Sequence, residues 1–176
     1  MPRKVKFGVF VGRLNPVHLG HEQVIQRMLA DWGPDHCLLV LCRAAGPTSL
    51  RHFFAYETRR HFVKTLFPSL RIVDLHDFDS DPEWLLALDD LIRLAGADPS
   101  QVQFYGGSDE DVRFFLDDGR HVVITNRFDG SSPKISATEV RDALIHRRSL
   151  DGLVNPAIEP ELRAQFDQQW EEFKRR

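Results

Sequence analysis

The chain of 176 residues contains only two cysteines, Cys37 and Cys42, which lie in one apolar run. Successive side chains of a strand alternate between its two faces, so residues five apart point to opposite sides and we expect no disulfide between them. Buried thiols that stay reduced are typical of a reducing compartment. The scarcity of cysteine therefore argues against a disulfide-stabilised secreted domain and predicts a cytoplasmic protein.

The sequence also lacks an excess of charge of either sign and any long apolar run. The net charge of −3 gives no general attraction to nucleic acid, so affinity for phosphate has to come from a local cluster of side chains. No apolar stretch approaches the ~20 residues that span a bilayer. Residues 1–4 lead into a strand pattern without the apolar core of a signal peptide. We therefore expect neither a nucleic-acid partner nor a membrane association.

Repeats, low-complexity tracts and linkers are absent as well, and a length of 176 residues suits one domain. We expect a single domain over residues 1–176, with its core at about 5–145 and a helical tail at about 146–176. The 13 phenylalanines indicate some aromatic surface for self-association, which leaves a homo-oligomer open.

Apolar runs alternate with helical patterns along the whole chain. A parallel strand that is buried on both faces reads as a continuous apolar run, as the segment at 37–42 does. Repeated strand–helix alternation predicts an α/β fold: a Rossmann-like, doubly wound parallel sheet of about five strands with helices on both faces. The expected strands are 5–11, 37–42, 70–75, 102–105 and 121–125, and the expected helices are 19–32, 55–66, 81–95, a short one from 109, one from 136 and one over 159–175.

The polar clusters of the sequence follow the expected strands. In open sheets of this kind, ligands bind beyond the carboxyl ends of the strands, where the strand order reverses. We therefore expect one binding edge, formed by Gly12-Arg13, the loops at 44–53 and 76–81, Gly106-Gly107 and the loop at 126–135.

The first of these clusters is the most informative. The apolar run from Val5 ends in Gly12-Arg13, and a Pro-containing turn then brings His18 and His21 to the start of a helix. Residues three apart on a helix share a face, and the free N–H groups and positive dipole of a first turn attract phosphate. Gly20 would allow a ligand to approach the backbone closely. The pattern predicts a polyphosphate site, the alternative being two surface histidines after an ordinary strand.

A second pattern lies at 135–141, Ile-Ser-Ala-Thr-Glu-Val-Arg. Ser136 or Thr138 can cap the helix, whose first turn offers a further anion site. Arg141 lies on the same flank of the helix as Thr138, within reach of a phosphate. On its own, this pattern favours an ordinary capping box on an amphipathic helix.

Taken together, the two patterns resemble the nucleotidyltransferase superfamily with its His-x-Gly-His signature. Gly12-Arg-Leu-Asn-Pro-Val-His-Leu-Gly-His21 is most similar to the archaeal-type nicotinamide mononucleotide adenylyltransferases, and Ile-Ser-x-Thr-x-x-Arg resembles the second signature, about 115 residues later. The resemblance covers residues 5–145. It implies transfer of AMP from ATP to nicotinamide mononucleotide, giving NAD and pyrophosphate, with Mg²⁺ arriving on the ATP and no metal site on the protein.

The resemblance also implies roles for individual residues. Catalysis would fall to His18, His21, Arg13 and Arg141. Nucleotide binding would involve Val11, Gly12, Arg51, Gly107, Asp109, Ser136 and Thr138, and acceptor binding Asn15, Asp81 and Trp84. Simpler interpretations stay open for three of these: a solvated loop charge for Arg51, a helix cap for Asp109 and a core tryptophan for Trp84.

The loop after the second strand departs from the family pattern. It has Cys42-Arg-Ala44 where the family has Gly-Ser-Ala, and Phe53-Phe-Ala-Tyr-Glu-Thr-Arg59 where the family has Pro-Phe-Thr followed by Glu-Arg, so that only Arg59 matches in place. These departures concern the identity of the acceptor substrate more than that of the nucleotide donor.

Two residues suggest which acceptor the site takes. Trp84, in a first helical turn, can stack on a flat electron-poor ring, and the resemblance places a stacking tryptophan there. Asp81 lies where the family often has Asn; a carboxylate accepts from an amide NH₂ but repels another carboxylate. We therefore expect nicotinamide to be preferred over nicotinate mononucleotide. The alternatives are another cytidylyl- or adenylyltransferase with a different phosphorylated acceptor, and a nucleotide-binding sensor without turnover.

Overall fold

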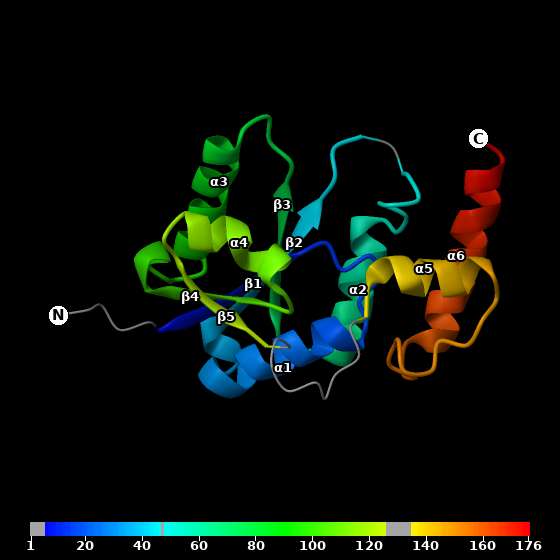
Figure 1. Cartoon of the computed structure of the whole chain (residues 1–176), viewed down its shortest axis with the longest axis horizontal. Coiled ribbons are helices and arrows are strands. Elements are labelled where there is room, and N and C mark those ends of the chain that lie inside the picture. Colours follow the sequence, from blue (N-terminus) through cyan, green and yellow to red (C-terminus); the bar gives the residue numbers. More distant parts are fainter. Residues whose placement is uncertain (1–5, 47, 126–134) are drawn as a thin grey trace.

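The computed structural model describes residues 6–46, 48–125 and 135–176 (Figure 1). Of the expectations above, those for residues 1–5, Pro47 and the loop at 126–134 fall outside these ranges.

One sheet of five parallel strands forms the centre of the molecule. The strand order is β3-β2-β1-β4-β5, so the order reverses between β1 and β4, as a doubly wound sheet requires. The strands are β1 Phe7–Gly12, β2 Cys37–Arg43, β3 Arg71–His76, β4 Val102–Gly106 and β5 His121–Ile124. The Rossmann-like α/β prediction is confirmed.

Helices cover both faces of this sheet (Figure 1). Residues of α1, α2, α5 and α6 pack into the larger apolar core on one face, and residues of α3 and α4 pack into the smaller core on the other. The helices are α1 Leu19–Trp32, α2 Tyr56–Leu66, α3 Asp81–Leu94, α4 Asp109–Asp117, α5 Ala137–Ile145 and α6 Glu159–Lys174, with short 3₁₀ turns at Pro34–His36 and Pro99–Gln101. Each expected bound lies within two residues of the observed one.

The alternation of side chains along β1 explains the two cores. Phe7 and Val9 point into the smaller core, and Phe10 points into the larger one. Gly8 faces α1, where a Cβ atom would lie only 2.7 Å from Cγ of Met28. The absence of a side chain there lets α1 pack directly on the central strand.

The apolar core continues beyond the limit near residue 145 that the sequence suggested. Leu150, Val154, Ile158, Leu162 and Phe166 are all buried in the larger core. Leu162 and Phe166 lie one turn apart on α6, and the other three come from the irregular segment that precedes this helix. The backbone N–H of Leu19 donates to the carbonyl of Leu153 at 2.9 Å, so this segment also contacts the start of α1. Residues 146–166 are therefore a part of the core.

The structure shows where the two cysteines and the phenylalanines of the described ranges lie. Cys37 and Cys42 are both buried and free, as expected. Among the phenylalanines of the described ranges only Phe78 is exposed, because the others fill the two cores, so the count of 13 gives no broad aromatic surface there. No helix in these ranges has both the length and the apolar character needed to cross a membrane.

Candidate active site

The turn between β1 and α1 joins three distant segments at the carboxyl edge of the sheet. Asn15 is buried, its peptide bond to Pro16 is cis, and its Oδ1 accepts from the backbone N–H of Phe54 at 2.9 Å. Its carbonyl accepts from Nη1 of Arg141 at 2.7 Å. The resemblance assigns Asn15 to binding of the acceptor substrate. In the structure, Asn15 holds the loop after β2 and the helix α5 against the turn.

His18 and His21 cap the helix α1 with their own side chains. Nδ1 of His18 accepts from the backbone N–H of Gly20 at 3.1 Å and of His21 at 3.4 Å, and Nδ1 of His21 accepts from the backbone N–H of His18 at 3.2 Å. This reciprocal arrangement is a capping box built from imidazoles, where Ser or Thr with Glu is usual. The two rings stack with their centroids 3.6 Å apart.

The cap fixes the protonation of both rings. A backbone N–H can only donate, so each Nδ1 presents its lone pair and the proton of each neutral ring is on Nε2. Burial lowers the pKa of His18 to about 4. Burial, and to a lesser extent the neighbouring His18, lower the pKa of His21 well below its ordinary value. At neutral pH the site therefore holds two uncharged imidazoles, each with one Nε2–H donor.

Besides the close approach of a ligand that the sequence predicts, Gly20 has a structural role. A Cβ atom at this position would lie 2.9 Å from Cε1 and 3.0 Å from Nδ1 of His18. The glycine is thus required so that the His18 ring can fold back over the first turn as a cap. The sequence placed it correctly but could not show which neighbour excludes a side chain.

A pocket of about 290 Å³, called the histidine pocket below, opens in front of His21 at the point where the strand order reverses. Among the residues that the structure describes, its lining carries three guanidinium groups and one carboxylate. Burial, and the charge of the nearby Arg51, lower the pKa of Arg141. Like charges held this close repel one another, and an anion between them relieves the repulsion. The lining residues are Phe10, Val11, Gly12, Arg13, Leu14, Asn15, His21, Arg51, Asp111, Ala137 and Arg141.

A second pocket of about 250 Å³ adjoins the first, sharing Arg13 and Asn15 with it. It is formed by the end of β2, the following loop and the start of α2. Nη2 of Arg13 also lies 3.7 Å from Oδ1 of Asp77. The two pockets together follow the carboxyl ends of β1 and β2.

The sequence did not predict several polar residues of these pockets, among them Asp111 and His52. Asp111 lines the histidine pocket from the first turn of α4, and His52 lines the second pocket. Nη1 of Arg13 lies 2.9 Å from Nδ1 of His52, and burial, followed by the charges of Arg13 and Arg51, lowers the pKa of His52. The position of His52 next to Arg51 in a polar loop was the one available signal.

Arg59, the residue that matches the family pattern in place, is buried and bonded to the backbone. Its Nε donates to the carbonyl of Phe54 at 3.1 Å, and its Nη1 donates to the carbonyls of Arg13 at 2.5 Å and Cys42 at 2.9 Å. Three elements of the site meet on this one guanidinium group. Its contacts are those of a structural arginine.

The start of α5 supports Arg141. Ser136 caps this helix by accepting from the backbone N–H of Glu139 at 3.1 Å, and Oγ1 of Thr138 accepts from Nη2 of Arg141 at 3.3 Å. Arg141 and Thr138 do share a flank, as expected. Ser136 and Thr138 are not among the residues that line the pocket, whereas Ala137 between them is.

The remaining expected residues lie at the same edge of the sheet, outside the linings of both pockets. Gly107 precedes α4, and Ser108 rather than Asp109 caps that helix, accepting from the backbone N–H of Asp111 at 3.4 Å. Asp81 and Trp84 lie in the first turn of α3, directly after β3. Trp84 is half-buried, with its ring 5.7 Å from that of Phe114 and 6.1 Å from that of Phe115. It packs partly on the smaller core, as the simpler interpretation had it.

The neutral state of His18 predicts a pH dependence of stability. Its pKa is 6.5 in an unfolded chain and about 4 in the fold. As the pH falls through this interval, the unfolded chain takes up a proton that the folded chain does not, so the free energy of unfolding decreases. Between pH 7 and pH 5 we expect this group to remove about 2 kcal/mol.

Urea unfolding of the wild type and of His18→Asn, at both pH values, measures this contribution. Asparagine can still accept as a cap but does not titrate, so the variant is expected to lose less stability on acidification. Equal losses in both proteins would mean that His18 is not held neutral by the fold.

Comparisons with known proteins agree with this geometry. The model of the cytidylyltransferase-like family matches residues 9–143. A Fusobacterium nucleatum protein named "Probable nicotinate-nucleotide adenylyltransferase" is 22% identical over 186 residues, a match that covers 88% of this chain and 95% of that protein.

Two solved structures share the fold at low identity. The crystal structure of a bifunctional NMN adenylyltransferase/ADP ribose pyrophosphatase from Francisella tularensis, complexed with AMP and Mn ion, has a TM-score of 0.63 and 18% identity, covering 83% of this chain and 43% of that one. The crystal structure of NadR protein in complex with NAD and AMP-PNP has a TM-score of 0.59 and 23% identity, covering 87% and 45%. This chain spans less than half the length of either protein.

The family match includes the histidine cap, the pocket in front of it and the start of α5. Since it spans most of the chain, this protein belongs to the cytidylyltransferase-like family of nucleotidyltransferases.

Proposed function

We propose that the protein transfers AMP from ATP to nicotinamide mononucleotide, with release of pyrophosphate. The observation that carries this proposal is the pair of stacked, neutral imidazoles at the start of α1, of which His21 lines the same pocket as Arg13, Arg51 and Arg141. Uncharged N–H donors beside crowded guanidinium groups suit a phosphate chain that changes its charge distribution during reaction.

The reaction needs no nucleophile from the protein. An oxygen of the acceptor phosphate attacks the α-phosphorus of ATP, a new phosphorus–oxygen bond forms, and the bond from the α-phosphorus to the α–β bridging oxygen breaks. The electron pair leaves with pyrophosphate, and no proton has to be transferred. Catalysis then consists of positioning and of stabilising charge on the phosphate oxygens.

The side chains divide this work by their chemistry. We assign the Nε2–H of His21, which lines the pocket, to a non-bridging oxygen of the α-phosphate, and that of His18 to the bridging oxygen. Arg13, Arg51 and Arg141 neutralise the charge that develops on the leaving pyrophosphate. Ser136 and Thr138 act at the β- and γ-phosphates through the start of α5 and through Arg141.

Magnesium belongs to the substrate in this proposal, since ATP carries it into the site. Across the part of the chain that the structure describes, no group of three or more His, Cys, Asp or Glu residues is placed to hold a metal ion. Asp111 also lines the histidine pocket, and its carboxylate would offer an oxygen ligand to an ion that arrives with ATP.

The acceptor is assigned from the start of α3. Trp84 offers part of its ring for stacking on nicotinamide, and Asp81 is exposed one turn earlier, where it would accept from the carboxamide NH₂. Nicotinate carries a carboxylate at this position and would be repelled. The proposal is therefore a preference for the amide form of the nucleotide.

The substitution Asp81→Asn tests this preference. Because it removes the repelling charge, we expect kcat/KM for nicotinate mononucleotide to rise about tenfold while kcat/KM for the nicotinamide form changes little. Asp79→Asn, in the same acidic loop, is the matched control and should leave the ratio unchanged. Equal use of both nucleotides by the wild type would contradict the assigned role of Asp81.

The activity itself is tested with pure protein, Mg²⁺, nicotinamide mononucleotide and ATP labelled at either the α- or the γ-phosphate. We expect the α-label in a dinucleotide and the γ-label in pyrophosphate. Label transfer only from CTP, or only to another phosphorylated acceptor, would replace the substrate but keep the reaction. Tight binding of ATP without any product would indicate a nucleotide sensor instead.

A further inference from the structure

The loop that supplies Arg51 has a basic side and an apolar side. Arg51 lines the histidine pocket, and His52 contacts Arg13 at 2.9 Å. The next two residues, Phe53 and Phe54, are almost completely buried, with exposed fractions of 1% and 4%. What holds the two phenylalanines therefore also determines where the two basic side chains lie.

The apolar side of this loop packs against the helix α6. The ring of Phe53 lies 5.1 Å from that of Phe166, 6.3 Å from that of Trp170 and 6.1 Å from that of Phe173. Along the helix, Trp170 stacks on Phe166 at 5.6 Å and on Phe173 at 5.7 Å. These three residues are spaced four and three apart and form one aromatic stripe that ends on the loop.

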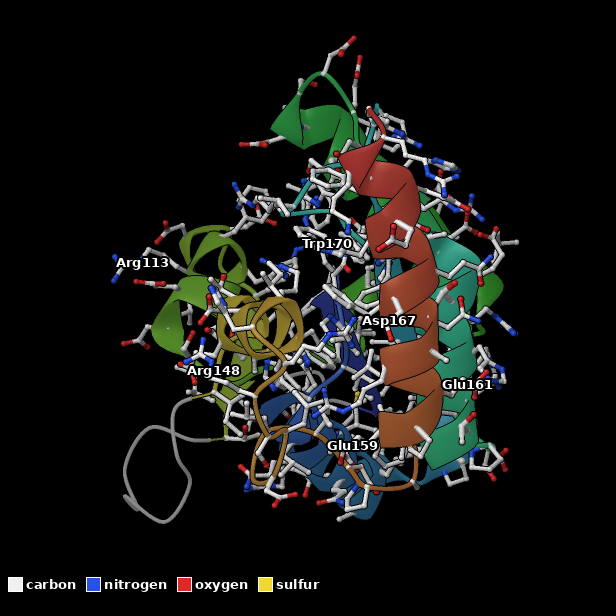
Figure 2. The ribbon with its side chains drawn as sticks, turned by 90° about the vertical axis from the view of Figure 1, so that its right-hand side faces the viewer. Arg113, Arg148, Glu159, Glu161, Asp167 and Trp170 are labelled. Carbon is white, nitrogen blue, oxygen red and sulfur yellow. The ribbon has the colours of Figure 1, made fainter. Side chains whose placement is uncertain are left out.

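Other contacts hold α6 in place independently of this stripe. Nε2 of His61 in α2 lies 3.0 Å from a carboxylate oxygen of Glu161, and Nη1 of Arg147 lies 3.1 Å from Oδ1 of Asp167. Figure 2 shows Glu161 on the side of α6 next to α2, whereas Trp170 lies on the other side of the helix. Nine residues of an α-helix make about two and a half turns, which puts the two side chains on opposite sides of the helix, in agreement with this view.

We propose that Trp170 is a positioning residue for nucleotide binding: through Phe53 it holds the 48–54 loop so that Arg51 reaches the histidine pocket and His52 reaches the second pocket beside it. This inference rests on the proposed function for the identity of the ligand, ATP. The contact between Trp170 and Phe53 does not depend on that function. Trp170 and Arg51, which are 119 positions apart in the chain, would then act as one unit.

The first test measures the loop itself. The backbone N–H of His52 donates to Oγ of Ser49 at 3.2 Å, and that of Phe54 donates to Asn15 at 2.9 Å. Trp170→Ala is expected to raise the hydrogen-exchange rates of these two amides about tenfold and to leave the amides of Gly20 and His21 unchanged. Unchanged exchange at His52 and Phe54 would overturn the proposal, whatever ligand the protein binds.

The second test measures binding, by calorimetry with Mg²⁺ and an ATP analogue whose α–β bridge is a methylene group. Trp170→Ala should weaken Kd about tenfold, and Trp170→Phe, which keeps the stacked ring, should stay within about twofold of the wild type. Glu161→Gln, on the opposite side of α6, is the matched control and should leave Kd unchanged. A loss in Glu161→Gln as large as in Trp170→Ala would indicate general loosening of the helix and would overturn the assigned role.

Coupling to Arg51 separates positioning from general stability. In an Arg51→Ala background, Trp170→Ala should weaken Kd by less than about twofold, since the group that it positions has been removed. Additive losses would contradict the proposal. Should Trp170→Ala not fold, Phe173→Leu, a milder change in the same stripe, takes its place, with an expected loss of about threefold. A wild type that binds no analogue would count against the proposed function, and the exchange experiment would still decide whether Trp170 holds the loop.

Discussion

Replacement of His21 by alanine is expected to lower kcat for adenylyl transfer by about 10²–10³, the usual loss when one preorganised donor to a developing oxyanion is removed. His21 lines the histidine pocket. The Nδ1 atom of its ring accepts from the backbone N–H of His18, so the Nε2–H group of the ring is the donor left for a ligand. KM for ATP should change far less than kcat, because an uncharged donor contributes little to binding of the ground state.

Two further variants make this result specific. His21→Gln places an amide N–H near the position of Nε2 and should recover part of the loss, leaving about a tenfold decrease in kcat. His121→Ala, at an exposed histidine on β5, is the control and should have normal kcat. Because His21→Ala also deprives the His18 N–H of its acceptor, the unfolding midpoint has to be measured alongside. A folded His21→Ala protein with near-normal kcat would show that this ring takes no part in the reaction.

The second large effect is expected on stability. Arg59→Met should lower the free energy of unfolding by about 3–5 kcal/mol, because it leaves the carbonyls of Phe54, Arg13 and Cys42 without their shared donor. Arg59→Lys should cost about half as much, since one ammonium group cannot reproduce the planar fork of a guanidinium. Urea unfolding at pH 7 provides the measurement.

Arg60→Met, at the exposed next position of α2, is the matched control and is expected to change the free energy of unfolding by less than about 0.5 kcal/mol. If Arg59→Met left stability intact and raised KM for the acceptor instead, Arg59 would be a binding residue, and the structural role derived from its contacts would be wrong.

The sequence predicted the edge of the sheet at which the candidate site lies, because the strands and helices that form this edge depend on local patterns. The run at 37–42 and the helical spacing at 19–32 fix their elements without reference to the rest of the chain. The histidine motif follows β1 for the same reason. Parallel order then places its turn beside the loops that follow β2 and β4.

What the sequence could not predict depends on contacts between distant residues or on the direction of single atoms. The bond from Arg141 to the carbonyl of Asn15 joins positions 126 apart, and no local pattern indicates it. The Nε2–H tautomers of His18 and His21 follow from which ring nitrogen faces the backbone, and the need for Gly20 follows from the same cap. Asp111 enters the pocket only because α4 starts where β4 ends, next to β1.

The aromatic stripe on α6 shows this limit most clearly. Its spacing predicted an amphipathic helix, but the identity of its partner required the fold. A segment described from sequence as a tail thus completes the larger core and packs on the loop that carries Arg51.

A crystal structure with Mg²⁺ and the α,β-methylene analogue of ATP tests the central claim most directly. We predict the α-phosphate within hydrogen-bonding distance of Nε2 of His21, and the β- and γ-phosphates among the guanidinium groups of Arg13, Arg51 and Arg141. A triphosphate bound away from both imidazoles, with His21 facing protein on all sides, would contradict it.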